Sequence, residues 1–262
     1  MATSRDFSTI SPSAYSLLVM RAQTGLPFAR KAAEIALGAE GVAAETARLS
    51  AIPGAELRRR HFEERYRSID ALLAEVGATR VLELAAGLSF RGLALAQREP
   101  VVYVDTDLPA MVETKARLVA ALDAGPLVGE LRVRPLEALD PAAFRTAIAE
   151  LPPGELAIVN EGLLMYLDPE EKRRLAGNIR DVLGARGGVW ITADIYLRGQ
   201  RDARIGQDDR LRNFLAAHRV EEQKFDSRDA AEAFFTDAGF AIQRRHSPRD
   251  DATRESWVVA PR

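Results

Sequence analysis

The chain has 262 residues, of which 47% are hydrophobic and 28% are charged, and it contains no cysteine. A chain of this length can bury a substantial core, as one large α/β domain or two small ones. The formal net charge of −2 gives no electrostatic support for nucleic-acid binding. The missing cysteines exclude disulfides, thiol catalysis, iron–sulfur clusters and thiolate zinc sites.

The beginning of the chain gives the first indication of location. The segment MATSRDFSTISPSAYSLLVM lacks the order of basic and then apolar residues that marks a signal peptide. No stretch approaches the roughly 18 uninterrupted apolar residues that a membrane-spanning helix requires. The absence of cysteine also fits a reducing compartment. We therefore expect a cytoplasmic protein that does not associate with a membrane.

Hydrophobic periodicity predicts three helices in the N-terminal part, between about residues 11 and 76. The first begins near Pro12 and the second after Pro27, because proline is favoured in the first turn of a helix. The third covers residues 55–76 and ends at Gly77. It has an apolar face and an opposite face crowded with arginine and glutamate.

From Arg80 onward, short apolar runs alternate with amphipathic segments. This alternation predicts a parallel sheet whose strands are joined by right-handed helical crossovers. The predicted strands are residues 81–84, 101–104, 131–133, 156–159, 189–193, 240–244 and 256–259, and the predicted helices begin near Ser89, Leu108, Pro141 and Pro169 or cover residues 211–218 and 230–238.

The expected fold class is therefore α/β and Rossmann-like, with a mainly parallel seven-stranded sheet, helices on both faces and an N-terminal helical lid. Residues 1–78 would form the lid region, packed on a core formed by residues 79–262. A polar stretch near residues 197–228 is too long for an ordinary connection. We expect it to be a lid insertion.

The turn after the first predicted strand, within VLELAAGLSFRGLAL, is the first candidate ligand-binding element. Small residues between a parallel strand and a helix let the backbone approach a nucleotide closely. The fingerprint G-x-G-x-x-G is absent, because Ala85, Gly87 and Ser89 stand at alternate positions of this turn. Pyrophosphate needs glycine where its oxygens meet the backbone, so Ala85 argues against a ligand such as NAD. S-adenosylmethionine, which has no phosphates, makes milder demands of this turn. A tight turn of small residues that serves packing alone is the other interpretation.

Carboxylates follow the next three predicted strands, at the same edge of the sheet. Asp105 and Asp107 are placed to accept hydrogen bonds from ribose hydroxyls, and Asp107 could instead cap the following helix. Glu137 could accept from an adenine amino group or lie solvated in its loop. Glu161 directly follows a buried strand, where a carboxylate is costly unless a cation such as a sulfonium or amino group compensates it.

Four blocks of the sequence together resemble the leucine carboxyl methyltransferase family: SPSAYSLLVMRAQTGLPFAR, LELAAGLS, VDTDLP and EGLLMYL. Within this family the chain is most similar to bacterial small-molecule O-methyltransferases of the tetracenomycin-biosynthesis type. The likeness extends from about Ile10 to Asp194. It implies a Rossmann-like class I methyltransferase that uses S-adenosyl-L-methionine as its cofactor and no metal ion.

The resemblance also implies roles for individual residues. Arg65 would bind the methionine carboxylate, and Arg67 is close enough to share this role. A guanidinium suits a free carboxylate because it binds bidentately, whereas the alternative for both arginines is a solvated helix face. Ala85 and Gly87 would lie beneath the cofactor, and Asp107 would bind its ribose. Glu137 and Ala138 would flank the adenine, although the family more often has aspartate or asparagine at the position of Glu137. Glu161 would lie near the methionine moiety, and Tyr166 would face the substrate as the catalytic candidate.

The expected reaction is methyl transfer to an oxygen of a small organic acceptor. A carboxylate, with a pKa of about 4, is ionised already, whereas a phenol, with a pKa of about 10, needs a base or an oxyanion-stabilising donor. His61, His218 and His246 stand in no motif with a nucleophile or metal partner, so each is expected to be a surface or packing residue. We therefore favour a carboxylate acceptor and methyl ester formation, with a phenolic hydroxyl as the alternative.

Two rival classes are an NAD-dependent oxidoreductase, against which the missing glycines argue, and a cofactor-binding module without catalysis. The expected partner is a small-molecule acceptor, with neither nucleic acid nor membrane, and the oligomeric state stays open. Arg198, Arg201 and Arg204 could pair with an acidic acceptor, although a solvated surface is the alternative. Trp190 and Trp257 fall within predicted strands and are expected in the core.

Overall fold

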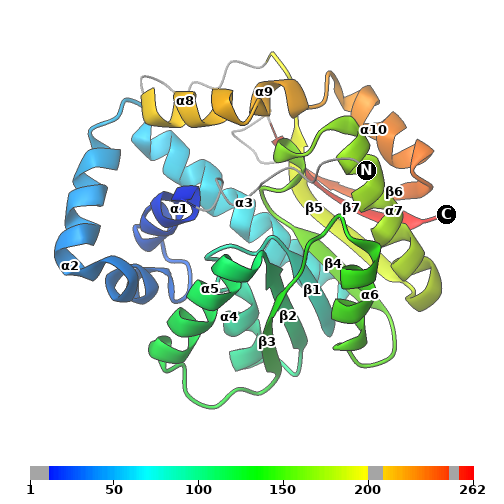
Figure 1. Cartoon of the computed structure of the whole chain (residues 1–262), viewed down its shortest axis with the longest axis horizontal. Coiled ribbons are helices and arrows are strands. Elements are labelled where there is room, and N and C mark those ends of the chain that lie inside the picture. Colours follow the sequence, from blue (N-terminus) through cyan, green and yellow to red (C-terminus); the bar gives the residue numbers. More distant parts are fainter. Residues whose placement is uncertain (1–11, 200–208, 248–253) are drawn as a thin grey trace.

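The computed structural model describes residues 12–199, 209–247 and 254–262, and shows a central sheet flanked by helices (Figure 1). The sheet has seven strands in the order β3-β2-β1-β4-β5-β7-β6. The first five run parallel, and β7 is antiparallel to both β5 and β6. The strands are β1 (Arg80–Leu84), β2 (Val102–Asp107), β3 (Glu130–Pro135), β4 (Leu156–Asn160), β5 (Gly188–Tyr196), β6 (Phe240–His246) and β7 (Arg254–Pro261).

The helices confirm the predicted alternation of strand and helix. The third predicted helix is observed with its expected bounds, and Gly77 ends it in the left-handed region, with φ of 62°. The helices are α1 (Pro12–Ala22), α2 (Ala29–Ser50), α3 (Ala55–Val76), α4 (Arg91–Arg98), α5 (Pro109–Leu122), α6 (Pro141–Ala149), α7 (Pro169–Arg186), α8 (Asp209–Ala217), α9 (Val220–Gln223) and α10 (Arg228–Asp237), together with the 3₁₀-helix η2 (Leu164–Tyr166).

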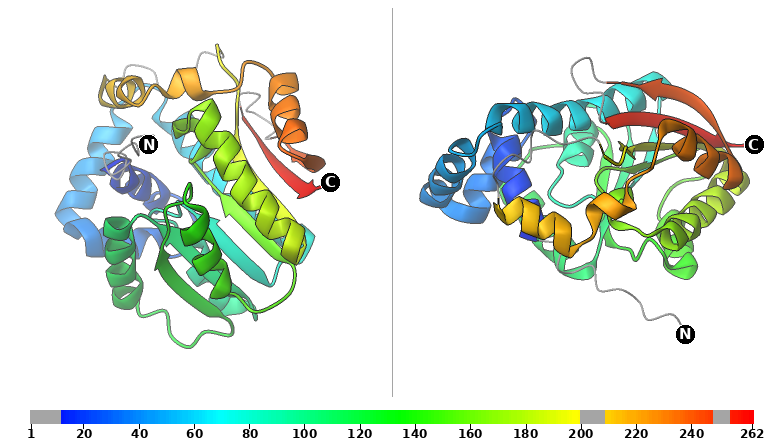
Figure 2. Two further views of the ribbon diagram at one scale, coloured as in Figure 1. Left: turned by 45° about the vertical axis from the view of Figure 1, so that its right-hand side comes forward. Right: turned by 90° about the horizontal axis from the view of Figure 1, so that it is seen from above.

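Successive side chains along the strands point to opposite faces of the sheet, and each face forms an apolar layer. Leu82 and Ile158 face one layer, which α6, α7 and α10 cover. Val81 and Val159 face the other, which α3 and α4 cover. Figure 2 shows these helices on opposite faces of the sheet. The mainly parallel sheet with helices on both faces is therefore confirmed.

Both tryptophans lie in the core, as expected. Trp190 and Trp257 are fully buried, and the ring of Trp190 packs edge-on against Phe235 and Phe240. Burial of aromatic side chains of this size contributes strongly to stability. These contacts hold the antiparallel β6–β7 pair and α10 against the parallel part of the sheet.

The N-terminal helices divide between two positions. Helices α1 and α2 pack against each other and, through Leu18, Ala32 and Leu118, against α5. Helix α3 instead covers a face of the sheet through Ile69 and Leu72. The segment expected as a lid, residues 1–78, thus includes one helix of the core. Within the described ranges, no helix is both long and apolar enough to span a membrane.

Helices α8 and α9 cross the top of the molecule in Figure 1, between α2 and α10. They lie within residues 197–228, where we expect an insertion, and residues 200–208 fall outside the described ranges. Together with α1 and α2 they surround the carboxyl ends of β1, β2 and β4. This edge of a parallel sheet is where ligands of α/β proteins bind.

Candidate functional site

A cavity of about 950 Å³ lies over this edge of the sheet. Its floor is formed by the loops that follow β1, β2, β3 and β4, and its walls come from α1, α2, α3, α8 and α9. Ligand pockets in proteins have volumes of about 300–1,000 Å³. The cavity therefore has room for a nucleoside-sized ligand and a second small molecule.

The turn after β1 is held in shape by a carboxylate from β2. Ala85 and Gly87 both adopt left-handed backbone conformations, with φ of 49° and 51°. The Gly87 N–H donates to Oδ2 of Asp107 at 2.7 Å, and the Leu108 N–H donates to Oδ1 at 2.8 Å. Asp107 thus joins the two loops at the cavity floor. It accepts from the residue next to it and not from the second or third residue of α5, so the alternative role of Asp107 as a helix cap is not observed.

The structure corrects the expectation for Asp105. Its carboxylate is buried and lies 2.6 Å from Nζ of Lys115 on α5, and it is not part of the cavity wall. Although alternation puts Asp105 and Asp107 on one face of β2, only Asp107 stands at the end of the strand. Burial raises the pKa of Asp105 to about 6, against the attraction of Lys115. Asp105 is a partner within the core.

The loop after β3 brings Glu137 and Ala138 to the cavity floor, beside the Asp107 loop. The Leu136 N–H donates to the carbonyl oxygen of Asp107 at 2.9 Å, which fixes one loop against the other. Oε1 of Glu137 accepts from the Leu139 N–H at 3.1 Å. A carboxylate with only one local hydrogen bond of this kind keeps acceptor capacity for a ligand.

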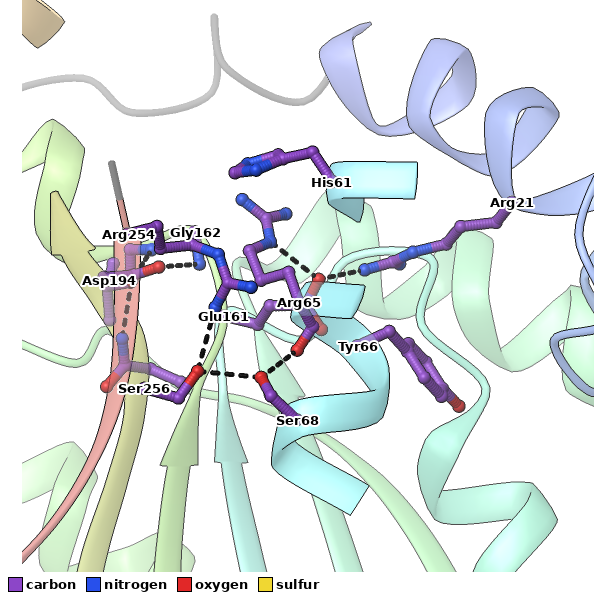
Figure 3. A network of polar contacts seen from close by, with 12 residues as sticks. Arg21, His61, Arg65, Tyr66, Ser68, Glu161, Gly162, Asp194, Arg254 and Ser256 are labelled. Atoms are coloured by element: carbon purple, nitrogen blue, oxygen red, sulfur yellow. Dashed lines mark hydrogen bonds and ion pairs between the residues drawn. The ribbon is translucent and has the colours of Figure 1, made fainter. Parts of the chain in front are cut away.

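Glu161, directly after β4, is the centre of a buried ion cluster. Three guanidinium groups converge on its carboxylate: Arg21 from α1, Arg65 from α3 and Arg91 from α4. Nε of Arg65 lies 3.0 Å from Oε1, and Nη2 of Arg91 lies 2.7 Å from Oε2. Figure 3 shows Arg21 and Arg65 approaching Glu161 from opposite sides. The cation that Glu161 requires is thus supplied by the protein itself.

Two further carboxylates complete the cluster around Arg91. Its Nη1 lies 2.5 Å from Oε1 of Glu83, and its Nε lies 2.7 Å from Oδ1 of Asp70. The three arginines are therefore matched by three acids, Glu161, Glu83 and Asp70. Burial alone would raise the pKa of Glu161, but Arg21, Arg65 and Arg91 outweigh it and hold that pKa well below its ordinary value.

This depressed pKa makes the contribution of Glu161 to stability dependent on pH. The unfolded carboxyl titrates near pH 4 and the folded one below it, so its stabilisation is complete above about pH 5 and is lost as the pH falls. We expect the difference in unfolding free energy between wild type and Glu161→Gln to shrink by about 1.4 kcal/mol for each pH unit below about 4. Urea unfolding at several pH values measures it. A difference that stays constant down to pH 3 would contradict the assignment.

Arg65 and Arg67 do not share a role. Arg65 is buried on the cavity wall. The side chain of Arg67 is 54% exposed, is not part of that wall, and pairs with Glu63 at 2.8 Å. Two residues apart on a helix with 3.6 residues per turn, the side chains point to nearly opposite sides. The expectation for Arg67 is therefore wrong, because it lies on the solvated face of α3.

Tyr166 stands on the wall, at the end of η2 and beside α8. Its ring meets Phe214 of α8 and His218 edge-on, with centroid distances of 6.3 and 6.2 Å. The phenol ring thus forms part of the contact between the loop after β4 and helix α8.

Two polar residues that position this site were not found from the sequence. Arg21 is the basic residue at the end of the otherwise mostly apolar helix α1. Asp194 of β5 is buried, and its carboxylate accepts from Gly162 N–H and Leu163 N–H, both at 2.7 Å. It also accepts from the Asn160 amide at 2.7 Å and Leu164 N–H at 3.0 Å. Because Asp194 lies near the carboxyl end of a parallel strand, where ligand sites of such sheets form, the sequence could have identified it as a candidate site residue.

His61 was expected to be a surface or packing residue, and the structure shows it packed inside the protein and not on the surface. His61 is buried on the cavity wall, and its Nε2 lies 2.9 Å from Oη of Tyr196, at the end of β5. Nη1 of Arg65 donates to the same Oη at 3.3 Å. Since His61 and Arg65 are four residues apart, one face of α3 presents both.

The arginines expected to meet an acidic acceptor lie elsewhere. Arg198 is not part of the cavity wall and pairs with Asp226 at 2.6 Å. Arg201 and Arg204 fall outside the described residues. The wall instead contains Arg48 and Arg58, and the second of these is buried. Among the residues that the structure describes, no cluster of three metal-ligating side chains occurs.

The sheet order, with its antiparallel β7, and the cavity above the ends of β1, β2 and β4 define the class: this is the Rossmann-like fold of class I methyltransferases. Two solved structures share it. The magnesium protoporphyrin IX methyltransferase of Synechocystis PCC 6803 aligns with a TM-score of 0.55 at 12% identity, over 79% of this chain and 87% of its own. An O-methyltransferase family protein of Burkholderia thailandensis aligns at 0.50 and 18%, over 74% and 55%.

The chain belongs to the leucine carboxyl methyltransferase family, whose family model matches residues 10–180. A Frankia alni protein named "Putative S-adenosyl-L-methionine-dependent methyltransferase FRAAL5401" is 31% identical over 175 residues, 66% of this chain and 53% of that protein. A Mycolicibacterium smegmatis protein with the same description is 32% identical over 203 residues, 73% of this chain and 62% of its own. The chain thus spans about half to two thirds of the relatives it matches.

Proposed function

We propose that this protein is an S-adenosyl-L-methionine-dependent O-methyltransferase that acts on a small organic acceptor. One observation carries the proposal: a single cavity brings together Asp107, Glu137 and Arg65 at the carboxyl edge of the sheet. Their chemistry suits the three polar parts of the cofactor. Carboxylates accept hydrogen bonds from ribose hydroxyls and an adenine amino group, and a guanidinium binds the methionine carboxylate.

The turn at Ala85 and Gly87 supports the same cofactor. It exposes small residues at the cavity floor, and Asp107 holds the turn in place. Ala138 lies on the same floor, where it would contact adenine. Glu161 would act on the methionine moiety mainly by holding Arg65, because its carboxylate is already bound by three arginines.

When bound, the cofactor supplies a methyl group that its sulfonium already activates. The protein's residues then have to align the acceptor and exclude water. We infer that α1, α2, α8 and α9 do this by covering the cavity, with Tyr166 holding the acceptor against the floor. The pKa of Glu45 on α2 is lowered mainly by its hydrogen bond from Arg48 and slightly by the charge of Arg210 on α8, so these two sides of the cavity lie near each other.

Two acceptor classes each have an observation in their favour. The buried Arg58 on the wall favours an acceptor with a carboxylate, which needs no base, whereas Arg48 is already paired with Glu45 at 2.7 Å. The pair of His61 and Tyr196 favours a phenolic hydroxyl, because it offers a route for a proton. Both acceptors would use the same cofactor site and the same cover.

Calorimetric titration with S-adenosylhomocysteine, with NADH as a parallel control, tests the cofactor. We expect micromolar binding of the first and none of the second. Asp107→Ala should weaken S-adenosylhomocysteine binding by about 10- to 100-fold, the scale of losing a hydrogen-bonded carboxylate that also shapes the turn. Asp226→Ala, which removes an exposed aspartate outside the cavity, is the matched control and should bind like wild type.

The result would decide between the rival classes. Binding of NADH alone would favour an oxidoreductase and overturn the proposal. Binding of S-adenosylhomocysteine without methyl transfer to any acceptor of a broad panel would favour a cofactor-binding module. Unchanged affinity in Asp107→Ala would show that the cofactor lies elsewhere in the cavity.

A further inference from the structure

His61 and Tyr196 form a buried hydrogen-bonded pair on the wall of the cavity, and the cofactor assignments above do not use it. The residues are 6% exposed each, and Nε2 of His61 lies 2.9 Å from Oη of Tyr196. Their rings are tilted, with centroids 5.9 Å apart. Both side chains take part in the cavity wall, on the side formed by α3 and the end of β5.

The hydrogen-bond inventory gives the pair a direction. A guanidinium has only donors, so Oη of Tyr196 accepts from Arg65 at 3.3 Å. We assign the Tyr196 proton to Nε2 of His61, 2.9 Å away, which is the arrangement in which the imidazole is neutral and accepts at this nitrogen. The chain of donation runs from Arg65 to Tyr196 to His61. Oη keeps one lone pair for a hydrogen bond from a bound molecule.

The charges around the pair suit a neutral phenol that passes protons on. Arg65 and Arg254 lie close enough to Tyr196 to lower its pKa, and Asp194 close enough to raise it. Arg58 lies one helical turn before His61 on α3 and is part of the same wall. Burial dominates and raises the pKa of Tyr196, so the phenol keeps its proton at neutral pH.

We propose that His61 and Tyr196 form a proton relay that removes the hydroxyl proton of a phenolic acceptor during methyl transfer. The inference rests on the proposed function and deepens it, because it names the acceptor class and the base. Tyr196 touches the acceptor, and His61 receives the proton through it. A histidine suits this role because its pKa lies near neutral pH.

The step balances as follows. The acceptor O–H gives its proton to Oη of Tyr196, whose own proton passes to Nε2 of His61, leaving an imidazolium. The acceptor oxygen forms a bond to the methyl carbon as the carbon–sulfur bond breaks, and its electron pair stays on sulfur. The sulfonium charge is thereby neutralised, the product is a methyl ether, and His61 later releases its proton to solvent.

The relay can be tested with acceptors that need a base to different extents. The first probe is 4-hydroxybenzoate, whose phenol stays protonated at neutral pH because an ordinary phenol has a pKa of about 10. The second is 4-hydroxy-3-nitrobenzoate, whose nitro group lowers the pKa of the phenol so that it is largely ionised at neutral assay pH. Each probe also carries a carboxylate. Formation of a methyl ether or an alkali-labile methyl ester therefore reports which oxygen was methylated.

We expect wild type to form the methyl ether of both probes. His61→Gln and Tyr196→Phe should each lower kcat for 4-hydroxybenzoate by about 10²- to 10⁴-fold, the usual contribution of general-base catalysis. The same variants should lower kcat for the nitro analogue less than about tenfold, because that phenol needs no base. The acidic limb of the wild-type pH profile should be lost in His61→Gln. His246→Gln makes the same change outside the cavity wall and should behave like wild type.

Affinity for S-adenosylhomocysteine separates the relay from the proposed function. If both variants bind it within about twofold of wild type and show the selective loss, the relay is supported. Equal losses on both probes, methyl esters alone, or no phenolic product from wild type would overturn the relay and leave the proposed function standing. Wild type that binds no S-adenosylhomocysteine would overturn the proposed function itself.

Discussion

Replacing Glu161 by alanine should lower the free energy of unfolding by about 3–5 kcal/mol, the range for removing one partner of a buried ion pair. The variant would leave three guanidinium groups facing one another, with side-chain exposures of 6% for Arg21, 5% for Arg65 and 1% for Arg91. Glu83 and Asp70 would then balance only part of that charge. Urea unfolding followed by circular dichroism measures the loss.

Glu63→Ala is the matched control for this prediction. It also removes a glutamate that pairs with an arginine, Arg67, but that arginine is 54% exposed. An exposed pair contributes less than about 1 kcal/mol, so the control should unfold almost like wild type. A loss of less than 1 kcal/mol in Glu161→Ala would mean that the arginines find other partners or water, and would contradict the central place of Glu161.

Replacing Asp194 by alanine should destabilise the protein by at least about 3 kcal/mol, because each buried donor left without an acceptor costs about 1–3 kcal/mol. The variant removes one acceptor from three consecutive backbone N–H groups, at Gly162, Leu163 and Leu164, and from the Asn160 amide. These residues shape the loop after β4. Affinity for S-adenosylhomocysteine should fall as well, since the loop carries Glu161.

Urea unfolding and calorimetry of the same preparation check both parts of the prediction. Asp226→Ala serves here too, because it removes an aspartate whose side chain is 71% exposed. If Asp194→Ala loses affinity but keeps its stability, the carboxylate would be a direct ligand contact instead of a scaffold. Loss of neither would show that water replaces the carboxylate in the loop.

The sequence predicted elements whose signals are local. Gly77 could be recognised as the end of α3, and it adopts the left-handed conformation there. The apolar runs of the seven strands could be recognised by their length and by the turns between them. The edge that carries the site followed from the parallel topology, because the carboxyl ends of parallel strands meet at one edge.

The errors arose where a side chain's surroundings come from another element. Asp105 and Asp107 lie two residues apart on the same face of β2, but only the structure shows that Lys115 binds Asp105. Arg65 and Arg67 stand in the same charged run, and the phase of α3 separates them. In a run of charged residues, the sequence does not show which side chains face the core and which face solvent unless the buried face of the helix is known.

The residues that were missed are joined across long stretches of chain. Arg21 meets Glu161 across 140 positions, and His61 meets Tyr196 across 135. Each of these side chains looks ordinary in its own segment. Their chemistry depends on contacts between α1 or α3 and the far half of the sheet, which periodicity and spacing do not predict.

The ion cluster at Glu161 also determines which side of the cavity can admit a ligand. Helices α1 and α3 are each anchored to the same β4 carboxylate, so moving either one outward would strip a buried guanidinium of its counterion. Helix α8, in contrast, has no fully buried side chain along its described length. We therefore expect ligands to enter the cavity beneath α8, while α1 and α3, which are held by their arginines, stay in place.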